Sequence, residues 1–142
     1  MVVHVKLKVK PMGSNIVREY VVLVNGGAHS PEPVLVVDEN IARELGFMGG
    51  EVVEASVADS KRKVYLIRNA VELVLVDNGE ELSKIKAHLV IHPGLEEPLI
   101  TDTTIDALGI QILSFSKGLW KHINDPPGKV RKSSKPSINT EY

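Results

Sequence analysis

The sequence predicts a mainly β domain with two short helices, folded as a closed barrel or a sandwich. Three observations lead to this prediction. Apolar and polar residues alternate with a period of two in several stretches, and turn signals rich in glycine, proline and asparagine separate those stretches. Two short segments have the pattern of a helix, and each ends in Leu-Gly. Repeated short strands with few helices are typical of closed or sandwich-like β domains.

The first third of the chain predicts, in order, a half-solvated strand, a turn, a returning strand, an irregular loop, a buried strand and a helix. These elements span 2–10, 11–15, 16–24, 28–33, 34–37 and 38–46. Pro31 and Pro33 make the loop irregular, because each removes a backbone donor and fixes φ. Asp38 is suited to begin the helix as its N-cap, and Gly46 is suited to end it.

The remainder predicts further short strands and a second helix. The strands span 51–58, 63–67, 71–77, 86–91, 99–100, 110–115 and 119–122. A polar hairpin tip is expected at 59–62, and Asp77-Asn78-Gly79 is a strong turn signal. The second helix follows Leu99-Ile100, with Thr101 or Asp102 as its cap and Gly109 at its end.

Composition excludes several classes of function. The 142 residues carry a net charge of −1, so nothing global draws the chain to nucleic acid or to a membrane. Cysteine is absent, which excludes disulfides and thiolate chemistry, and aromatic residues make up only 4%. We expect a cytoplasmic protein without a cofactor.

The chain is expected to divide into a β domain at 1–123 and a flexible basic tail at 124–142. The tail has few apolar residues and a basic cluster between Lys129 and Lys135. Such a cluster is usually only solvated, and contact with nucleic acid or an acidic partner is the alternative. His88 and His92 have helical metal-ligand spacing, but on a strand they would lie about 13 Å apart, so we expect surface histidines and no metal site.

Two segments together resemble a known family. Tyr20 to Val24 is an apolar run that leads into Asn25-Gly26-Gly27-Ala28, and Leu99-Ile100 leads into a helix that ends in Ala107-Leu108-Gly109-Ile110. They resemble the retropepsin-like aspartic peptidases, which place an Asp-Thr/Ser-Gly-Ala loop after an apolar strand. That family also has a Leu/Ile-Ile-Gly segment that leads into a short helix ending in Leu-Gly.

The resemblance covers roughly residues 2–122 and includes a flap-like hairpin with its tip near Ser60. It implies a closed acid-protease barrel with two short helices. It also implies a homodimer, because each chain of the family supplies one catalytic loop. The resulting cleft would bind an extended peptide as an added strand.

The chain departs from the family at the residue that matters most for chemistry. Asn25 stands at the position of the catalytic Asp, and the resemblance implies that Gly26, Gly27, Ala28 and His29 line the substrate cleft. An Asn amide is neutral and its nitrogen only donates, so it cannot take a proton from water. Thr101 replaces the family's Gly, and Asp102 stands where retroviral members usually have Arg. We therefore expect an inactive relative that binds peptides.

Other interpretations stay open at this stage. Asn25-Gly26 is also the preferred pair for a tight hairpin turn, and it is prone to deamidation, which would create Asp or isoAsp. An active endopeptidase or other hydrolase would have to use altered residues such as His29 or Asp102. The segment from Val24 to Ser30 is a weak match to a phosphate loop, because no helix pattern follows it and the Lys-Ser/Thr pair is missing.

Overall fold

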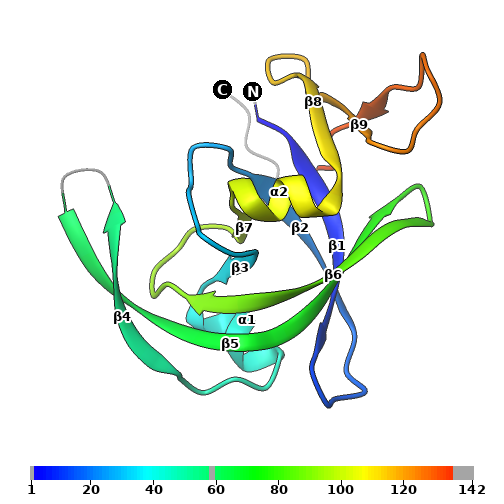
Figure 1. The fold of residues 1–142 in the computed structure, drawn as a ribbon. Helices are drawn as coiled ribbons and strands as arrows, with labels where there is room; N and C mark the ends of the chain where they lie inside the picture. Colours follow the sequence, from blue (N-terminus) through cyan, green and yellow to red (C-terminus); the bar gives the residue numbers. More distant parts are fainter. Residues whose placement is uncertain (1, 58–59, 136–142) are drawn as a thin grey trace.

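The computed structural model of the chain describes residues 2–57 and 60–135. These residues form ten strands and two short helices (Figure 1). In chain order they are β1 His4–Pro11, β2 Arg18–Val24, β3 Val34–Val37, α1 Glu39–Glu44, β4 Glu51–Val57, β5 Ser60–Asp77, β6 Glu80–Ile91, β7 Leu99–Ile100, α2 Asp102–Leu108, β8 Ile110–Ser114, β9 Leu119–His122 and β10 Arg131–Lys132. The prediction of a mainly β domain with two short helices is confirmed.

Six of these strands close into a barrel of mixed parallel and antiparallel pairs. Their order around the barrel is β1, β2, β7, β3, β6 and β5, and β5 pairs with β1 to complete the ring. The β2–β7 and β3–β6 pairs are parallel. β4 extends the sheet beyond β5, and β8, β9 and β10 form a separate three-stranded sheet. The prediction of a closed barrel is therefore confirmed as well.

The alternation in the first strand produces the barrel core. One face of this segment is fully buried, and it carries Val3, Val5, Leu7 and Val9. Removing one such side chain from water is worth roughly 1.5–3 kcal/mol. On the other face, the Lys6 ammonium lies 3.5 Å from Glu19 and the Lys8 ammonium lies 3.1 Å from Glu81.

The fifth strand is longer than the sequence predicts. The runs at 63–67 and 71–77 belong to one 18-residue strand, β5. A register shift against β6 lies between Ile67 and Val71, and Asn69 there has a φ of +50°. A bulge of this kind bends a strand without ending it. The first part of β5 pairs with β4 as a hairpin that projects from the barrel at the left of Figure 1, and the tip residues 58–59 lie outside the described residues.

Local turn and cap signals are confirmed. Asn78 and Gly79 have φ values of +50° and +76° and connect β5 to β6. The Asp38 carboxylate accepts the backbone N–H of Ile41 at 2.9 Å and so caps α1. Gly109 ends α2 with a φ of +79°, and a Cβ at this position would lie 2.8 Å from the His122 ring. Glycine is required there by both conformation and space.

The structure differs from the predicted flexible tail, because the segment at 131–134 is hydrogen-bonded to the rest of the chain. β10 pairs with β9, and Arg131 is only 6% exposed. Its guanidinium donates to both carboxylate oxygens of Asp125, at 2.8 and 2.7 Å, and to Asp77 at 2.8 Å. It also lies 5.7 Å from the ring centroid of the buried Trp120. Residues 136–142 lie outside the described part of the chain.

The Arg131–Asp125 pair stays charged through the ordinary pH range. Hydrogen bonds from Arg131 hold the pKa of Asp125 well below its usual range, and the backbone N–H of His122 acts in the same direction. The carboxylates of Asp125 and Asp77 in turn raise the pKa of Arg131. A buried carboxylate left without its partner is strongly destabilising. A composition-based prediction of disorder missed this segment because Arg131 bonds to Asp77, which lies 54 residues away in sequence, as well as to the nearby Asp125.

Replacing Arg131→Ala should lower the free energy of unfolding by roughly 3 kcal/mol, because the largely buried carboxylates of Asp77 and Asp125 lose their common cationic partner. Lys129→Ala is the matched control, since Lys129 lies in the same segment with an exposed side chain. Its effect should stay within about 0.5 kcal/mol. Urea unfolding measures both, and equal stability of the two variants would contradict the packing of this segment.

Candidate functional site

The candidate site lies where β2 and β7 end. These strands are parallel, with Val24 beside Ile100, so their carboxyl ends lie together and place Asn25 next to Thr101. β7 also pairs with β3, which puts it between β2 and β3. Asn25-Gly26 is therefore no hairpin turn between those strands, and neither residue has the positive φ that such a turn needs.

Backbone hydrogen bonds join the loop after β2 to the start of α2. The N–H of Asn25 donates to Ile100 O at 3.2 Å, and the N–H of Asp102 donates to Ala28 O at 2.9 Å. Within the loop, the N–H of Ala28 donates to Asn25 O at 3.1 Å. Two segments 70 or more residues apart in sequence thus form one hydrogen-bonded unit.

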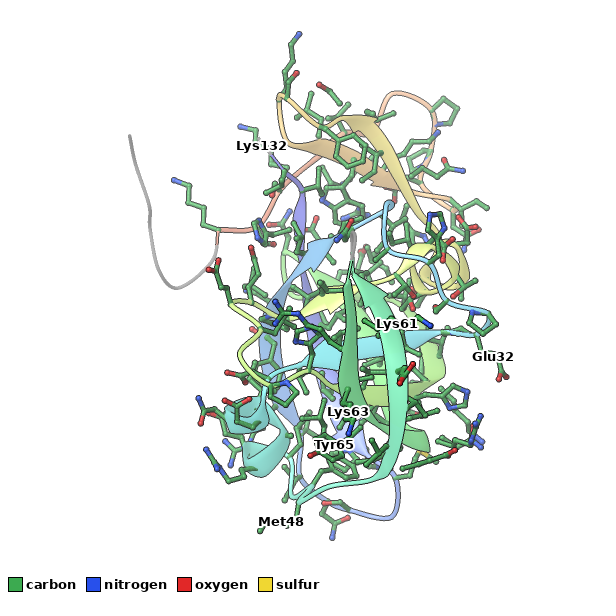
Figure 2. The ribbon with its side chains drawn as sticks, turned by 90° about the vertical axis from the view of Figure 1, so that its left-hand side faces the viewer. Glu32, Met48, Lys61, Lys63, Tyr65 and Lys132 are labelled. Carbon is green, nitrogen blue, oxygen red and sulfur yellow. The ribbon has the colours of Figure 1, made fainter. Side chains whose placement is uncertain are left out.

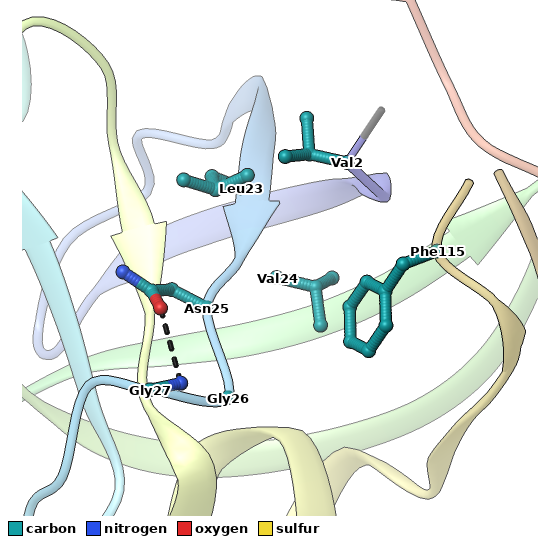
Figure 3. A pocket seen from close by; sticks show the side chains of 7 residues that line it. All are labelled: Val2, Leu23, Val24, Asn25, Gly26, Gly27 and Phe115. Atoms are coloured by element: carbon teal, nitrogen blue, oxygen red, sulfur yellow. Dashed lines mark hydrogen bonds between the residues drawn. The ribbon is translucent and has the colours of Figure 1, made fainter.

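The Asn25 side chain folds back on its own loop. Its Oδ1 accepts the backbone N–H of Gly27 at 3.1 Å (Figure 3). Figure 3 shows this amide on the side of the loop away from Phe115. The amide carries no charge and supplies no general base, so position 25 orders the loop and offers no acid–base chemistry as it stands.

Hydroxyl groups beneath the loop form a network that sequence reasoning did not identify. Ser30 Oγ lies 2.6 Å from Thr101 Oγ1 and 2.8 Å from Thr103 Oγ1. Thr101 Oγ1 is 3.0 Å from Thr104 Oγ1, which donates to Val34 O and accepts from Val34 N–H, both at 2.8 Å. Thr101 holds the N-cap position of α2, but its side chain makes no cap hydrogen bond. The only sequence signal was the run Thr101-Asp102-Thr103-Thr104 at a helix start.

The structure pairs His29 with Asp102, two residues that the sequence suggested separately. His29 Nδ1 donates to Asp102 Oδ2 at 2.9 Å, while Asp102 Oδ1 accepts the N–H groups of Ser30 and Thr103 at 3.1 and 2.7 Å. These bonds, first the one from Ser30 and then the one from His29, lower the pKa of Asp102. When His29 is neutral, its Nε2 is left as an acceptor on a side chain that is 80% exposed.

An open, mainly apolar hollow of about 580 Å³ borders the loop. Its lining residues are Val2, Leu23, Val24, Asn25, Gly26, Gly27 and Phe115 (Figure 3). Val2 and Phe115 are each 49% exposed. Exposed apolar side chains that gather beside a polar loop are typical of contact surfaces.

Other candidates from the sequence lie elsewhere. His88 is buried, contrary to the prediction of a surface position: its Nδ1 accepts the N–H of Asn69 at 2.8 Å, and its Nε2 lies 3.3 Å from Glu32. The segment after Val24 runs to β3 without a helix, which removes the phosphate-loop interpretation. Among residues 2–57 and 60–135, no three His, Asp or Glu side chains gather as metal ligands. No helix in the same residues is long and apolar enough to cross a membrane.

Comparison of the chain with models of known protein families gives no match. Comparison with curated proteins gives no significant match either. The geometry of the chain itself is therefore the basis for assigning a function.

Asp102 should make stability depend on pH in the acid range. Folding lowers its pKa, so its contribution to stability is complete above the unfolded value of about 3.9 and is lost as the pH falls through the folded value. With Asp102→Asn, the deficit in unfolding free energy relative to the unmodified protein should be widest near neutral pH and should shrink in acid.

Urea unfolding at a series of pH values measures this deficit. Asp106→Asn is the control, because Asp106 is an exposed residue of the same helix and its substitution should cause little change at any pH. A deficit for Asp102→Asn that does not vary with pH would contradict the proposed role of the carboxylate.

Proposed function

We propose that the protein is a retropepsin-like homodimer that binds extended peptides and lacks aspartic-peptidase activity. The main support is the joined loop unit, in which Asn25-Gly26-Gly27-Ala28 follows β2 and is hydrogen-bonded to the start of α2. The closed barrel and the projecting β4–β5 hairpin also agree with the resemblance in the sequence.

The loss of activity follows from the side chain at position 25. Aspartic peptidases use two carboxylates that share one proton, so that one acts as base and the other as acid. A homodimer with Asn25 in both chains has neither. Positioned acid–base groups contribute roughly 10²–10⁴-fold to rate, so their loss leaves little catalysis. The Asp102 carboxylate does not substitute directly, because three donors already engage it.

The homodimer is supported by the apolar hollow beside the loop. A site made from two Asn25 loops needs a contact surface next to each loop, and Val2 and Phe115 provide exposed apolar area there. Burying such area is worth about 25 cal/mol per Å² before the cost of association is subtracted. A second copy of the same surface would satisfy the two-fold symmetry that most homodimers have.

Peptide binding is supported by the β4–β5 hairpin. In the described residues β4 pairs only with β5, so its outer edge offers main-chain donors and acceptors to an extended chain. Lys61, Lys63 and Tyr65 alternate along β5 and so share one face (Figure 2). Tyr65 lies at the base of this face, where it lines a hollow with Phe47 and Met48. The two exposed lysines add donors for peptide carbonyl groups.

A second candidate function is a hydrolase that uses His29 as general base. The 2.9 Å bond to Asp102 favours it, because a carboxylate that holds Nδ1–H leaves Nε2 free to accept a proton. Against it, Ser30 Oγ is already engaged by Thr101 and Thr103, so the loop presents no paired nucleophile. The two functions differ in their dependence on His29 and on position 25.

In solution the chain should have twice its 15.5 kDa mass. Phe115→Glu should shift it toward the single-chain mass, because a charge would enter the apolar contact. Met12→Glu is the control, since Met12 is equally exposed but lies in the β1–β2 turn, outside the lining of the hollow. Light scattering after size exclusion at micromolar concentration measures the mass, and a clean 15.5 kDa species from the unmodified chain would defeat the homodimer.

Freshly prepared protein should not cleave unfolded casein between about pH 3 and pH 7, because position 25 has no carboxylate. Asn25→Asp should introduce cleavage below about pH 6, where a facing pair can hold one proton. Because Thr101 and Asp102 depart from the family pattern, we expect a partial gain. Robust cleavage by the unmodified chain that is abolished by His29→Ala would support the second candidate function and overturn the first.

A further inference from the structure

The described residues contain two Asn-Gly pairs, and the fold holds them in different ways. Asn25-Gly26 lies in the candidate site, and Asn78-Gly79 forms the turn between β5 and β6. Asn-Gly is the dipeptide most open to deamidation, because glycine has no Cβ to shield its backbone nitrogen. The local geometry then decides whether that nitrogen can attack the side chain.

The reaction needs no enzyme and no reactant besides water. The backbone nitrogen of Gly26 attacks Cγ of Asn25, the N–Cγ bond forms, and the C–N bond of the side-chain amide breaks. The amide nitrogen takes up the proton that the backbone nitrogen loses, and it leaves as ammonia. Water then opens the resulting cyclic imide at one of its two carbonyls and gives Asp or isoAsp. The net change replaces an amide with a carboxylate.

The loop at Asn25 favours this attack in two ways. Asn25 Oδ1 accepts the N–H of Gly27 at 3.1 Å, which folds the side-chain carbonyl over the peptide unit that contains the attacking nitrogen. The same N–H is placed to stabilise the negative charge that develops on Oδ1 when the nitrogen adds to Cγ. Gly26 is exposed, and a Cβ built on it would meet no heavy atom within 4 Å. The loop therefore has room for the cyclic imide and for the water that opens it.

The turn at Asn78 is held differently. Asn78 and Gly79 are fixed at φ values of +50° and +76°, between the paired residues Asp77 and Glu80. Among the hydrogen bonds of the described residues, the Asn78 side-chain oxygen accepts none from the backbone that follows it. Formation of the cyclic imide at Asn78 would have to disrupt a tight turn that is held in place by the pairing of β5 with β6.

We propose that Asn25 is a site of spontaneous deamidation in the folded protein, and that Asn78 is protected. Deamidation goes beyond the proposed binding function, because it introduces a carboxylate at position 25, where the translated sequence has an amide. The Asp product keeps the length of the backbone. The isoAsp product adds a carbon to it and so disturbs the bond from Ala28 N–H to Asn25 O.

The test follows both sites in one sample of the full, folded chain, aged at mildly alkaline pH. Trypsin separates them, because residues 19–43 carry Asn25 and residues 69–84 carry Asn78. Fragment masses locate the conversion, and enzymatic methylation of isoAsp identifies the second product. Conversion at Asn25 should be at least about tenfold faster than at Asn78, which corresponds to a difference of roughly 1.4 kcal/mol in activation free energy.

Gly26→Ala is the matched control. Gly26 is not among the glycines with positive φ and has space for a Cβ, so this variant should fold normally, and its conversion should be several-fold slower. In urea, where the fold is lost, the two Asn-Gly sites should react at similar rates. The proposal is overturned if folded Asn25 reacts no faster than Asn78, or if Gly26→Ala leaves the rate unchanged.

Discussion

The two-residue strand β7 is the element on which both the barrel and the candidate site depend. It lies between β2 and β3, parallel to one and antiparallel to the other, and its Ile100 is completely buried. The carbonyl of Ile100 also accepts the N–H of Asn25. The hydrogen bonds that close the barrel therefore continue into the bonds that shape the loop. Moving the loop away from α2 would open the wall of the barrel at the same point.

Much of the fold could be predicted from the sequence because many of its determinants are local. The alternation in β1, the cap at Asp38 and the stop at Gly109 each depend on a few neighbouring residues. The continuity of β5 through Asn69 could not be predicted, because the chain looks interrupted there and the bulge is held by the partner strand. The packing of Arg131 could not be predicted either, since Asp77 lies 54 residues away from it.

For the site, the sequence identified the loop that begins at Asn25 but not the hydroxyl network that supports this loop. The resemblance pointed to Asn25 and to the residues up to His29, and the structure gathers them beside Asp102. The hydroxyl network could not be predicted, because Ser30 and Thr104 have no distinguishing pattern and meet only through tertiary contacts. Buried hydroxyls are stable only when all are paired, and no buried side-chain polar atom in the described residues lacks a partner. The loop is thus firmly built even though its central side chain is uncharged.

The position of Arg131 also has a consequence for synthesis in the cell. Chains leave the ribosome from the N-terminus at about 5–20 residues per second, so the hairpin that carries Asp77 emerges well before residue 131. Until then, Asp77 and Asp125 lack the cation that the finished structure places between them. The barrel strands can pair earlier. In a nascent chain halted before Arg131, however, the paired strands would contain the Asp77 carboxylate without a compensating cation. The contacts of Arg131 with Asp77 and Asp125 can therefore form only after a segment outside the barrel has been translated.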